Sequence, residues 1–265
     1  MRLARAPGAA RTARDQRSAA PASVSHTPGS SPAIRAVLLD AMGTLLELQD
    51  PVEPLRRELR ERAGLTLDSA RCQHGLAAEI AYYRAHHDEG DTEPRLVALR
   101  RRCAGVLRDA LGPPAQTIAL EQIEAALRAA LRFRAHADAA GALDALHARG
   151  LILVAVSNWD RSLHQVLATV GLASRLDGVV TSAQAGASKP DPAIFARALE
   201  LAGGIAANAA LHVGDRLDED VEGARAAGLR PVLLQRCLPE EGSAQLSTPT
   251  VTVIRSLSEL PALVS

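Results

Sequence analysis

From about residue 138 to the end of the chain, short apolar runs alternate with segments of helical periodicity. The runs expected to form strands are residues 151–156, 178–181, 210–213, 231–234 and 251–254. An earlier run at residues 34–40 (IRAVLLD) is apolar on both faces, which is typical of a buried parallel strand. Helices are expected at residues 138–147, 161–170, 192–201, 219–227 and from 256. This alternation predicts an α/β fold with a doubly wound parallel sheet.

A long segment without strand-like runs separates the first strand from the later ones. Its helical periods predict helices at residues 54–62, 76–86, 96–111 and 120–133. Gly64, Gly90 and the Gly112-Pro113-Pro114 sequence are expected to separate these helices. We therefore expect a core of residues 33–49 and 136–265, with a helical lobe of residues 50–135 inserted into it. Within the core, Asp138 is a candidate N-cap for the helix that follows it.

The first 32 residues have a different composition from the rest. Within residues 1–30, five arginines oppose one aspartate, and Ala, Ser, Pro and Gly dominate without apolar periodicity. Such a segment is expected to be disordered. It resembles an organellar transit peptide in composition, but a simple N-terminal extension is the favoured interpretation.

Bulk composition excludes several classes of partner. The formal net charge is zero, so nothing favours binding to nucleic acid or to a membrane surface. No apolar run approaches the roughly 18 residues of a membrane span. Cys72, Cys103 and Cys237 are odd in number and show no metal-ligand spacing, which is typical of reduced thiols in a cytoplasmic protein.

Lys189 is the only lysine among 30 basic residues. Arginine supplies every other basic side chain, so a lysine at this position indicates a requirement that arginine does not meet. An ammonium group is a compact point charge, which suits a tight site. Lys189 is therefore a candidate functional residue.

Polar residues follow several of the expected strands. In parallel α/β sheets, ligands bind outside the carboxyl ends of the strands, which is where these residues would lie. In chain order they are Asp40, Ser157 with Asn158, Lys189, Asp215 and Asp220. Singly, Ser157 is commonly a turn residue, and Asp220 could complement a helix dipole. Together, carboxylates beside one lysine suit Mg²⁺ and a phosphoryl group, with Asp40 as nucleophile and with Lys189 and Ser157 holding phosphate oxygens.

Four ordered motifs carry a family resemblance: DAMGTL (40–45), VSNWD (156–160), SKPDPAIF (188–195) and HVGDRLDEDVEGARAAG (212–228). They resemble the motifs of haloacid dehalogenase-like hydrolases over about residues 34–260. The resemblance implies a Rossmann-like core, a C1-type cap at residues 50–135 and Asp40 as nucleophile. It further implies that substrate phosphate is bound by Thr44, Ser157, Asn158 and Lys189. The implied Mg²⁺ ligands are Asp40, Met42 through its backbone carbonyl, Asp215 and Asp220.

Met42 departs from the family's phosphatase pattern, which has a second aspartate two residues after the nucleophile. That aspartate is the general acid and base, and such catalysis is typically worth 10²–10⁴-fold. One interpretation is a phosphatase that needs good leaving groups or takes its acid from elsewhere, the candidates being Glu47, Glu79, His86, His87 and Asp88. A phosphonatase mechanism is excluded, because the insert has no lysine.

Two alternatives to phosphatase activity follow from the same departure. A 2-haloacid dehalogenase resembles this chain at Met42 but lacks the acids corresponding to Asp215 and Asp220. The second alternative is a catalytically weak protein that binds phosphate or a partner. The favoured interpretation is a Mg²⁺-dependent phosphohydrolase of small phosphorylated metabolites.

Overall fold

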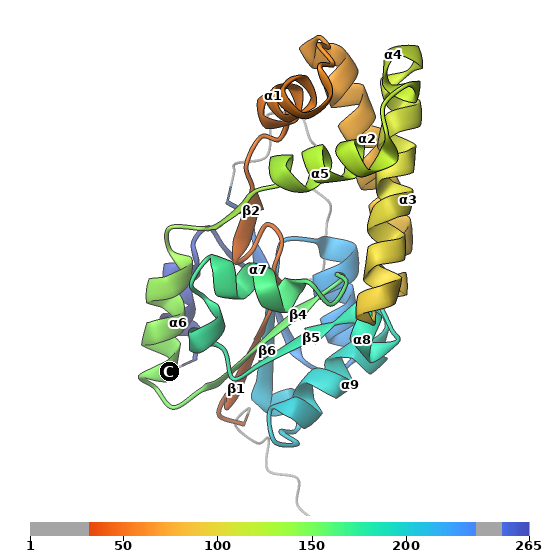
Figure 1. Cartoon of the computed structure of the whole chain (residues 1–265). Coiled ribbons are helices and arrows are strands. Elements are labelled where there is room, and N and C mark those ends of the chain that lie inside the picture. The colour runs from red at the N-terminus through yellow and green to blue at the C-terminus, as the bar shows by residue number, and fades with distance from the viewer. Residues whose placement is uncertain (1–31, 237–250, 265) are drawn as a thin grey trace, which may run out of the picture. The chain divides into compact units, whose positions relative to one another are not determined.

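The computed structural model describes residues 32–236 and 251–264, which lie in one compact unit of the chain. Its centre is a six-stranded sheet in which all neighbours are parallel, in the order β5-β4-β1-β6-β7-β8 (Figure 1). The strands are β1 (Ala36–Leu39), β4 (Ile152–Ser157), β5 (Gly178–Thr181), β6 (Ala210–Gly214), β7 (Arg230–Leu234) and β8 (Thr252–Ile254). The predicted parallel α/β fold is therefore confirmed.

β1 lies in the interior of the sheet, and its side chains alternate between the two faces. Val37 and Leu39 belong to a hydrophobic cluster with residues of α6 and α7. Ala36 and Leu38 belong to a second cluster, with residues of α9, on the opposite face. Because successive side chains of a strand point to opposite faces, burial on both sides requires an uninterrupted apolar run.

Helices cover both faces of the sheet. One face is covered by α6 (Ala139–His147), α7 (Leu163–Thr169) and α11 (Leu260–Leu263), and the other by α9 (Pro192–Leu201) and α10 (Gly223–Ala226). The short helix α8 (Ser182–Ala185) follows β5. Single 3₁₀ turns span Ala173–Arg175, Ala207–Ala209 and Leu257–Glu259.

The inserted helical region contains its own hydrophobic core. Its helices are α1 (Val52–Ala63), α2 (Ser69–His86), α3 (Glu93–Leu111), α4 (Pro113–Gln116) and α5 (Leu120–Ala130), with a 3₁₀ turn, η1, at His87–Glu89 (Figure 1). Apolar side chains of all five helices form one cluster that contains no residue of the parallel sheet. The predicted helix boundary at Gly64 holds: Gly64 ends α1 in a left-handed conformation.

A two-stranded antiparallel ribbon joins the ends of this insert, and the sequence did not indicate it. It pairs β2 (Leu46–Leu48) with β3 (Phe133–Ala135). The last helix of the insert consequently ends at Ala130, three residues before its predicted end at 133. Each strand has three residues, which is too short to produce a clear alternating pattern.

Asp138 occupies the N-cap position of α6, but its side chain makes no capping hydrogen bond. The carboxylate instead accepts two hydrogen bonds from Arg236, at 2.9 and 3.0 Å. Ser256 Oγ and the backbone N–H of Leu257 also donate to it, at 2.8 and 2.9 Å. The expected role as a side-chain cap is wrong, because tertiary partners occupy the carboxylate.

Two further sequence inferences concern residues beyond the described part. Of the leader expected at residues 1–32, residues 1–31 lie outside the described part of the chain. Cys237 also lies outside the described part. Cys72 and Cys103 are both buried as free thiols. Within the described ranges, no helix is long and apolar enough to cross a membrane.

Candidate active site

The sheet brings the predicted polar groups together at the carboxyl ends of its central strands. Asp40 directly follows β1, Ser157 is the last residue of β4, and Asp215 directly follows β6. Lys189 comes from the loop between α8 and α9. Asp220 lies in a π-helical turn, η4 (Leu217–Glu222), where a regular helix from residue 219 had been expected. π-helical turns are rare and frequent at functional sites.

Lys189 joins the nucleophile candidate to the acidic turn. Its Nζ atom lies 2.6 Å from Asp40 Oδ1 and 2.5 Å from Asp220 Oδ1. Only 4% of Lys189 is exposed, so the ammonium group has exchanged water for these two carboxylates. Although burial alone would lower the pKa of Lys189, the two carboxylates raise it, and the side chain stays charged.

Asp40 combines a buried carboxylate with one oxygen that remains available. Oδ1 accepts hydrogen bonds from Lys189 and, at 3.2 Å, from Ser157 Oγ. No described group donates a hydrogen bond to Oδ2. Burial raises the pKa of Asp40 to about 7, with the Lys189 charge opposing this shift and the Asp220 charge adding to it. A further positive charge beside Asp40 would favour the ionised, nucleophilic form.

Asp220 is held in place from two directions. His212, fully buried on β6, lies with Nε2 3.0 Å from Asp220 Oδ1. The backbone N–H of Arg216 donates to Oδ2 at 3.0 Å. Burial alone would raise the pKa of Asp220, but Lys189 and His212 hold it well below its ordinary value. Burial lowers the pKa of His212, so its neutral form is favoured at neutral pH.

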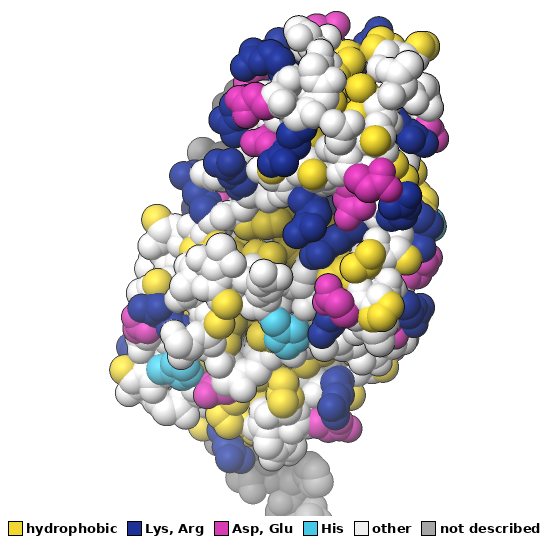
Figure 2. All heavy atoms as spheres, in the orientation of Figure 1, with side chains coloured by type: hydrophobic (Ala, Val, Ile, Leu, Met, Phe, Trp, Pro, Cys, Tyr) yellow, Lys and Arg dark blue, Asp and Glu magenta, His cyan; other side chains and the backbone are white. Residues whose placement is uncertain are grey.

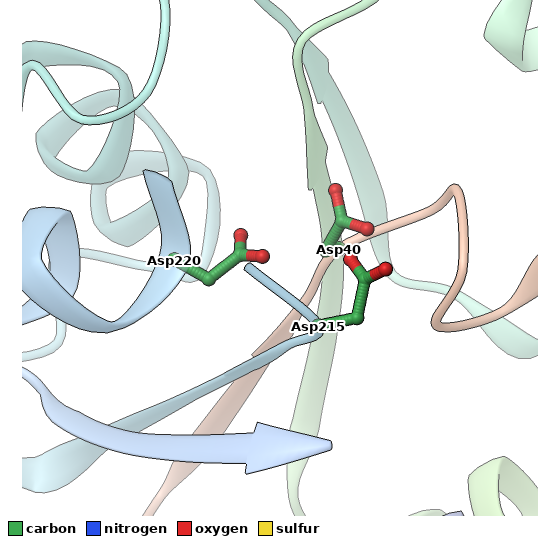
Figure 3. Close-up of side chains that lie close together, drawn as sticks. All are labelled: Asp40, Asp215 and Asp220. Atoms are coloured by element: carbon green, nitrogen blue, oxygen red, sulfur yellow. The ribbon is translucent and has the colours of Figure 1, made fainter. Parts of the chain in front are cut away.

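Three carboxylates converge where a metal ion could bind. Asp40, Asp215 and Asp220 each offer an oxygen, and these oxygens lie within 4.8 Å of one another (Figure 3). Asp215 is the most exposed of the three residues, but its carboxylate is partly desolvated, and this desolvation together with the charge of Asp220 raises its pKa. Hard oxygen ligands in a cluster of like charge are what Mg²⁺ prefers, so the residues fit the predicted ion. Figure 3 shows Asp220 approaching the other two carboxylates from η4.

Gly214 explains how Asp220 can approach so closely. A Cβ atom at position 214 would lie 2.0 Å from Asp220 Cγ, which excludes any side chain there. The glycine at the end of β6 therefore provides space for the carboxylate of the next turn.

Asn158 and Thr44, both predicted phosphate ligands, lie in different surroundings. The Asn158 amide accepts from Lys189 N at 2.7 Å and donates to Lys189 O and Glu219 Oε2, each at 3.0 Å. These bonds engage both amide hydrogens and favour a positioning role for Asn158. Thr44 is fully buried, its Oγ1 has no hydrogen-bond partner among the described residues, and it does not line the cleft described next.

A cleft of about 1130 Å³ lies between the helical region and the sheet edge. Asp40, Met42, Ser157 and Asp215 are among the core residues that line it. On one side, Tyr83 Oη donates to Asp160 Oδ2 at 3.0 Å and joins the helical region to the core. Figure 2 shows the hollow from the front, below α5 and above α7, with hydrophobic side chains on its floor.

The candidate replacements for the missing acid divide into two groups. Glu47 pairs with Arg134 at 2.6 Å, and neither Glu47 nor His86 lines the cleft. Glu79, His87 and Asp88 do line it. Of these, Glu79 is buried, and burial raises its pKa to about 6.

Two residues of the site were not identified from the sequence. His212 was part of a recognised motif, but nothing in its spacing indicated a bond to Asp220. Arg236 follows β7 and donates to the carbonyls of Gly43, at 3.2 Å, and Thr44, at 2.8 Å. Because the same guanidinium group bonds to the Asp138 carboxylate, it links the loop after Asp40 to Asp138. A lone arginine after a strand carries no signal of this long-range role.

Comparisons with known proteins agree with these motifs. Residues 34–228 match the family model of haloacid dehalogenase-like hydrolases. Haloacid dehalogenase-like hydrolase domain-containing protein 3 of Danio rerio is 30% identical over 240 residues, covering 86% of this chain and 96% of that protein. Phosphoserine phosphatase of Thermus thermophilus is 38% identical over 140 residues, covering 52% of this chain and 55% of that protein.

Solved structures share the fold. A HAD-hydrolase of Bacillus subtilis bound to magnesium has a TM-score of 0.63 at 21% identity, covering 88% of this chain and all of that one. A 2-haloacid dehalogenase of Pseudomonas syringae has a TM-score of 0.60 at 25% identity, covering 87% of this chain and 97% of that one.

Proposed function

Because the chain belongs to the haloacid dehalogenase-like hydrolases, we propose that it is a Mg²⁺-dependent phosphohydrolase acting on small phosphorylated metabolites. The observation that carries the proposal is the cluster of Asp40, Asp215 and Asp220 beside the buried Lys189. It offers a nucleophile, a cation site and a fixed positive charge within one cluster of contacting side chains. Phosphoryl transfer requires mainly such positioning and charge stabilisation.

In the proposed reaction, Asp40 Oδ2 attacks phosphorus and the bond from phosphorus to the leaving oxygen breaks. The leaving group departs with its electron pair and takes a proton from water or from an acid in the cleft. Water then attacks the phosphorus of the aspartyl phosphate, which releases inorganic phosphate and restores the Asp40 carboxylate. The product phosphate carries the oxygen of that water.

The surrounding residues have separate proposed roles. Lys189 and Ser157 would hold phosphoryl oxygens, since both already contact Asp40 Oδ1. Asp40, Asp215, Asp220 and the Met42 carbonyl would hold Mg²⁺, which supplies charge neutralisation to the phosphoryl group. Asn158 would position Lys189, whose backbone it holds at both N–H and carbonyl.

Phosphatase activity is favoured over dehalogenation by Asp215 and Asp220. Displacement of halide from carbon needs a carboxylate nucleophile but no metal, so it gives no role as metal ligands to Asp215 and Asp220. The similarity to a protein named phosphoserine phosphatase points the same way. Met42 lines the cleft without offering a proton, so turnover is expected to be fastest for phosphates whose leaving group needs no acid.

The proposal is tested with p-nitrophenyl phosphate and acetyl phosphate, with Mg²⁺ and with EDTA. We expect Asp40→Asn and EDTA each to abolish turnover. Asp144→Asn is the matched control, because Asp144 pairs with Arg175 on the exposed side of α6. Activity that survives Asp40→Asn would sink the mechanism. Chloride release from 2-chloropropionate would favour the dehalogenase, and binding of phosphate without turnover would favour the phosphate-binding protein.

A further inference from the structure

The helical region presents arginines to the cleft that holds the proposed active site. Arg84 on α2, Arg100 on α3, Arg128 on α5 and Arg132 just after α5 all line it. They come from three helices of the inserted region, and we call the part of the cleft lining that this region supplies the arginine wall. Figure 2 shows basic side chains beside the hollow, next to α5.

These four arginines differ from their neighbours in having no acidic partner. Within the part of the chain that the structure describes, none of them forms an ion pair with a carboxylate. The next two residues on α3 do: Arg101 pairs with Glu121 at 2.9 Å, and Arg102 pairs with Glu89. Neither Arg101 nor Arg102 lines the cleft. On α3 the two outer arginines thus have counter-charges and Arg100, which lines the cleft, has none among the described residues. The helical region also has arginines away from the cleft without an ion pair to a described residue, namely Arg60, Arg71 and Arg108, so the four cleft arginines are set apart by their common position.

The two walls of the cleft therefore differ in charge. The core wall carries Asp40, Asp160, Asp215 and Glu219, opposed there by Arg216. The acids that the helical region contributes to the cleft are Glu79, Asp88 and Glu124, one fewer than its four arginines. A phosphoryl group bound at the core wall, with its cation, would leave the arginine wall facing the rest of the substrate.

We propose that the substrate carries a second anionic group, a carboxylate or a second phosphate, which this arginine wall binds. The inference rests on the proposed function, because it takes the phosphoryl position from the Asp40 site. Guanidinium groups match both anions through paired N–H donors in a planar fork, and Arg is preferred where such groups are recognised. A second anion at the wall would select doubly charged metabolites over simple alkyl phosphates.

Binding of stable phosphonates tests this without requiring turnover. The probes are ω-phosphonocarboxylates with chains of three to six carbons, α,ω-bisphosphonates of the same lengths, and alkylphosphonates that lack the second anion. Dissociation constants are measured by calorimetry on the Mg²⁺-loaded full chain. We expect at least one length to bind about tenfold tighter than the matching alkylphosphonate. The two series show whether carboxylate or phosphate is the preferred group.

Two double variants locate the effect: Arg84→Gln with Arg100→Gln, and Arg128→Gln with Arg132→Gln. We expect at least one pair to lose the tenfold preference while alkylphosphonate binding stays unchanged, and Arg101→Gln to retain it. Equal affinity for probes with and without the second anion, or a preference that survives in both double variants, would overturn the inference. The proposed function is tested separately, because it would fail if p-nitrophenyl phosphate were not turned over. In that case the comparison of phosphonate affinities would still test whether the cleft binds a second anion.

Discussion

Gly43 and Asp215 are so close that a Cβ atom at position 43 would lie 2.2 Å from Asp215 Oδ2. Gly43 also has a φ of +82°, which a side chain would make costly. The loop after Asp40 and the loop after β6 therefore share one space, and only glycine allows both. Since Asp215 is a proposed Mg²⁺ ligand, the residue at position 43 controls the geometry of the metal site.

We expect Gly43→Ala to weaken Mg²⁺ binding by about 10–100-fold, the usual loss when support for a metal ligand is disturbed. The measurement is the Mg²⁺ concentration that gives half-maximal turnover of p-nitrophenyl phosphate. Gly64→Ala is the matched control: Gly64 has a φ of +65°, but a Cβ there meets nothing within 4 Å. It introduces similar backbone strain without touching the site. An identical Mg²⁺ dependence in the two variants would contradict the assigned role of Gly43.

We expect Met42→Asp to raise turnover of alkyl phosphates by about 10²–10⁴-fold, because it restores a general acid and base two residues after the nucleophile. Acetyl phosphate should gain less, because its leaving group departs without a proton. The measurement is kcat for both substrates, with Met42→Asn as an uncharged control of similar shape. No gain in the aspartate variant would mean that the acid is not the missing part.

Asn158→Ala should lower kcat by about tenfold or more with little change in KM, because the amide holds the backbone of Lys189 and does not need to contact substrate. Asn158→Asp should be worse, since it places a second carboxylate beside Glu219, which now lies 3.0 Å from Nδ2. Kinetics on p-nitrophenyl phosphate separate this role from the one predicted by the sequence. A raised KM with unchanged kcat would instead show that Asn158 binds substrate.

The contact between Asp138 and Arg236 should make stability depend on pH under acid conditions. Burial alone would raise the pKa of Asp138, but hydrogen bonds from Arg236, Ser256 and Leu257 lower it to about 2. The unfolded chain, with an ordinary value of 3.8, therefore takes up the proton first as pH falls. The stabilisation, about 2 kcal/mol, is complete above about pH 4 and is lost as pH falls through about 2.

Urea unfolding of the wild type and of Asp138→Asn from pH 7 to pH 2 measures this contribution. The difference in unfolding free energy between the two proteins should shrink across that acid window. Asp144→Asn provides the control, because its partner Arg175 lies on the exposed surface. A difference that is constant with pH would contradict the assigned pKa of Asp138.

The sequence predicted the parts of this protein that depend on local pattern. The central strands of the parallel sheet were found because burial on both faces leaves an apolar run, as in β1. The meeting of Asp40, Ser157, Lys189 and Asp215 followed from one rule, that the carboxyl ends of parallel strands share an edge. Lys189 stood out because arginine supplies every other basic side chain.

The contacts that the sequence did not reveal are long-range. Arg236 bonds to the Thr44 carbonyl across 192 positions, and no periodicity connects such a pair. The ribbon of β2 and β3 is set by chain entry into and exit from the insert, with Glu47 opposite Arg134. Asn158 has the residue type of a ligand, and only the fold shows that its amide bonds to the Lys189 backbone. These roles depend on tertiary partners and leave no trace in local composition.

The position of β1 has a consequence for how the chain is made. β1 is synthesised first among the strands of the parallel sheet, yet its two partners are β4 and β6. A ribosome must therefore add more than a hundred residues before β1 can pair with either strand. The second edge of β1 is fully paired only after β6 has emerged as far as Val213, the partner of Leu39. Until then the nascent chain exposes an apolar strand that can pair with other chains. The helical insert has its own hydrophobic core and is synthesised completely during this interval, before either partner strand of β1.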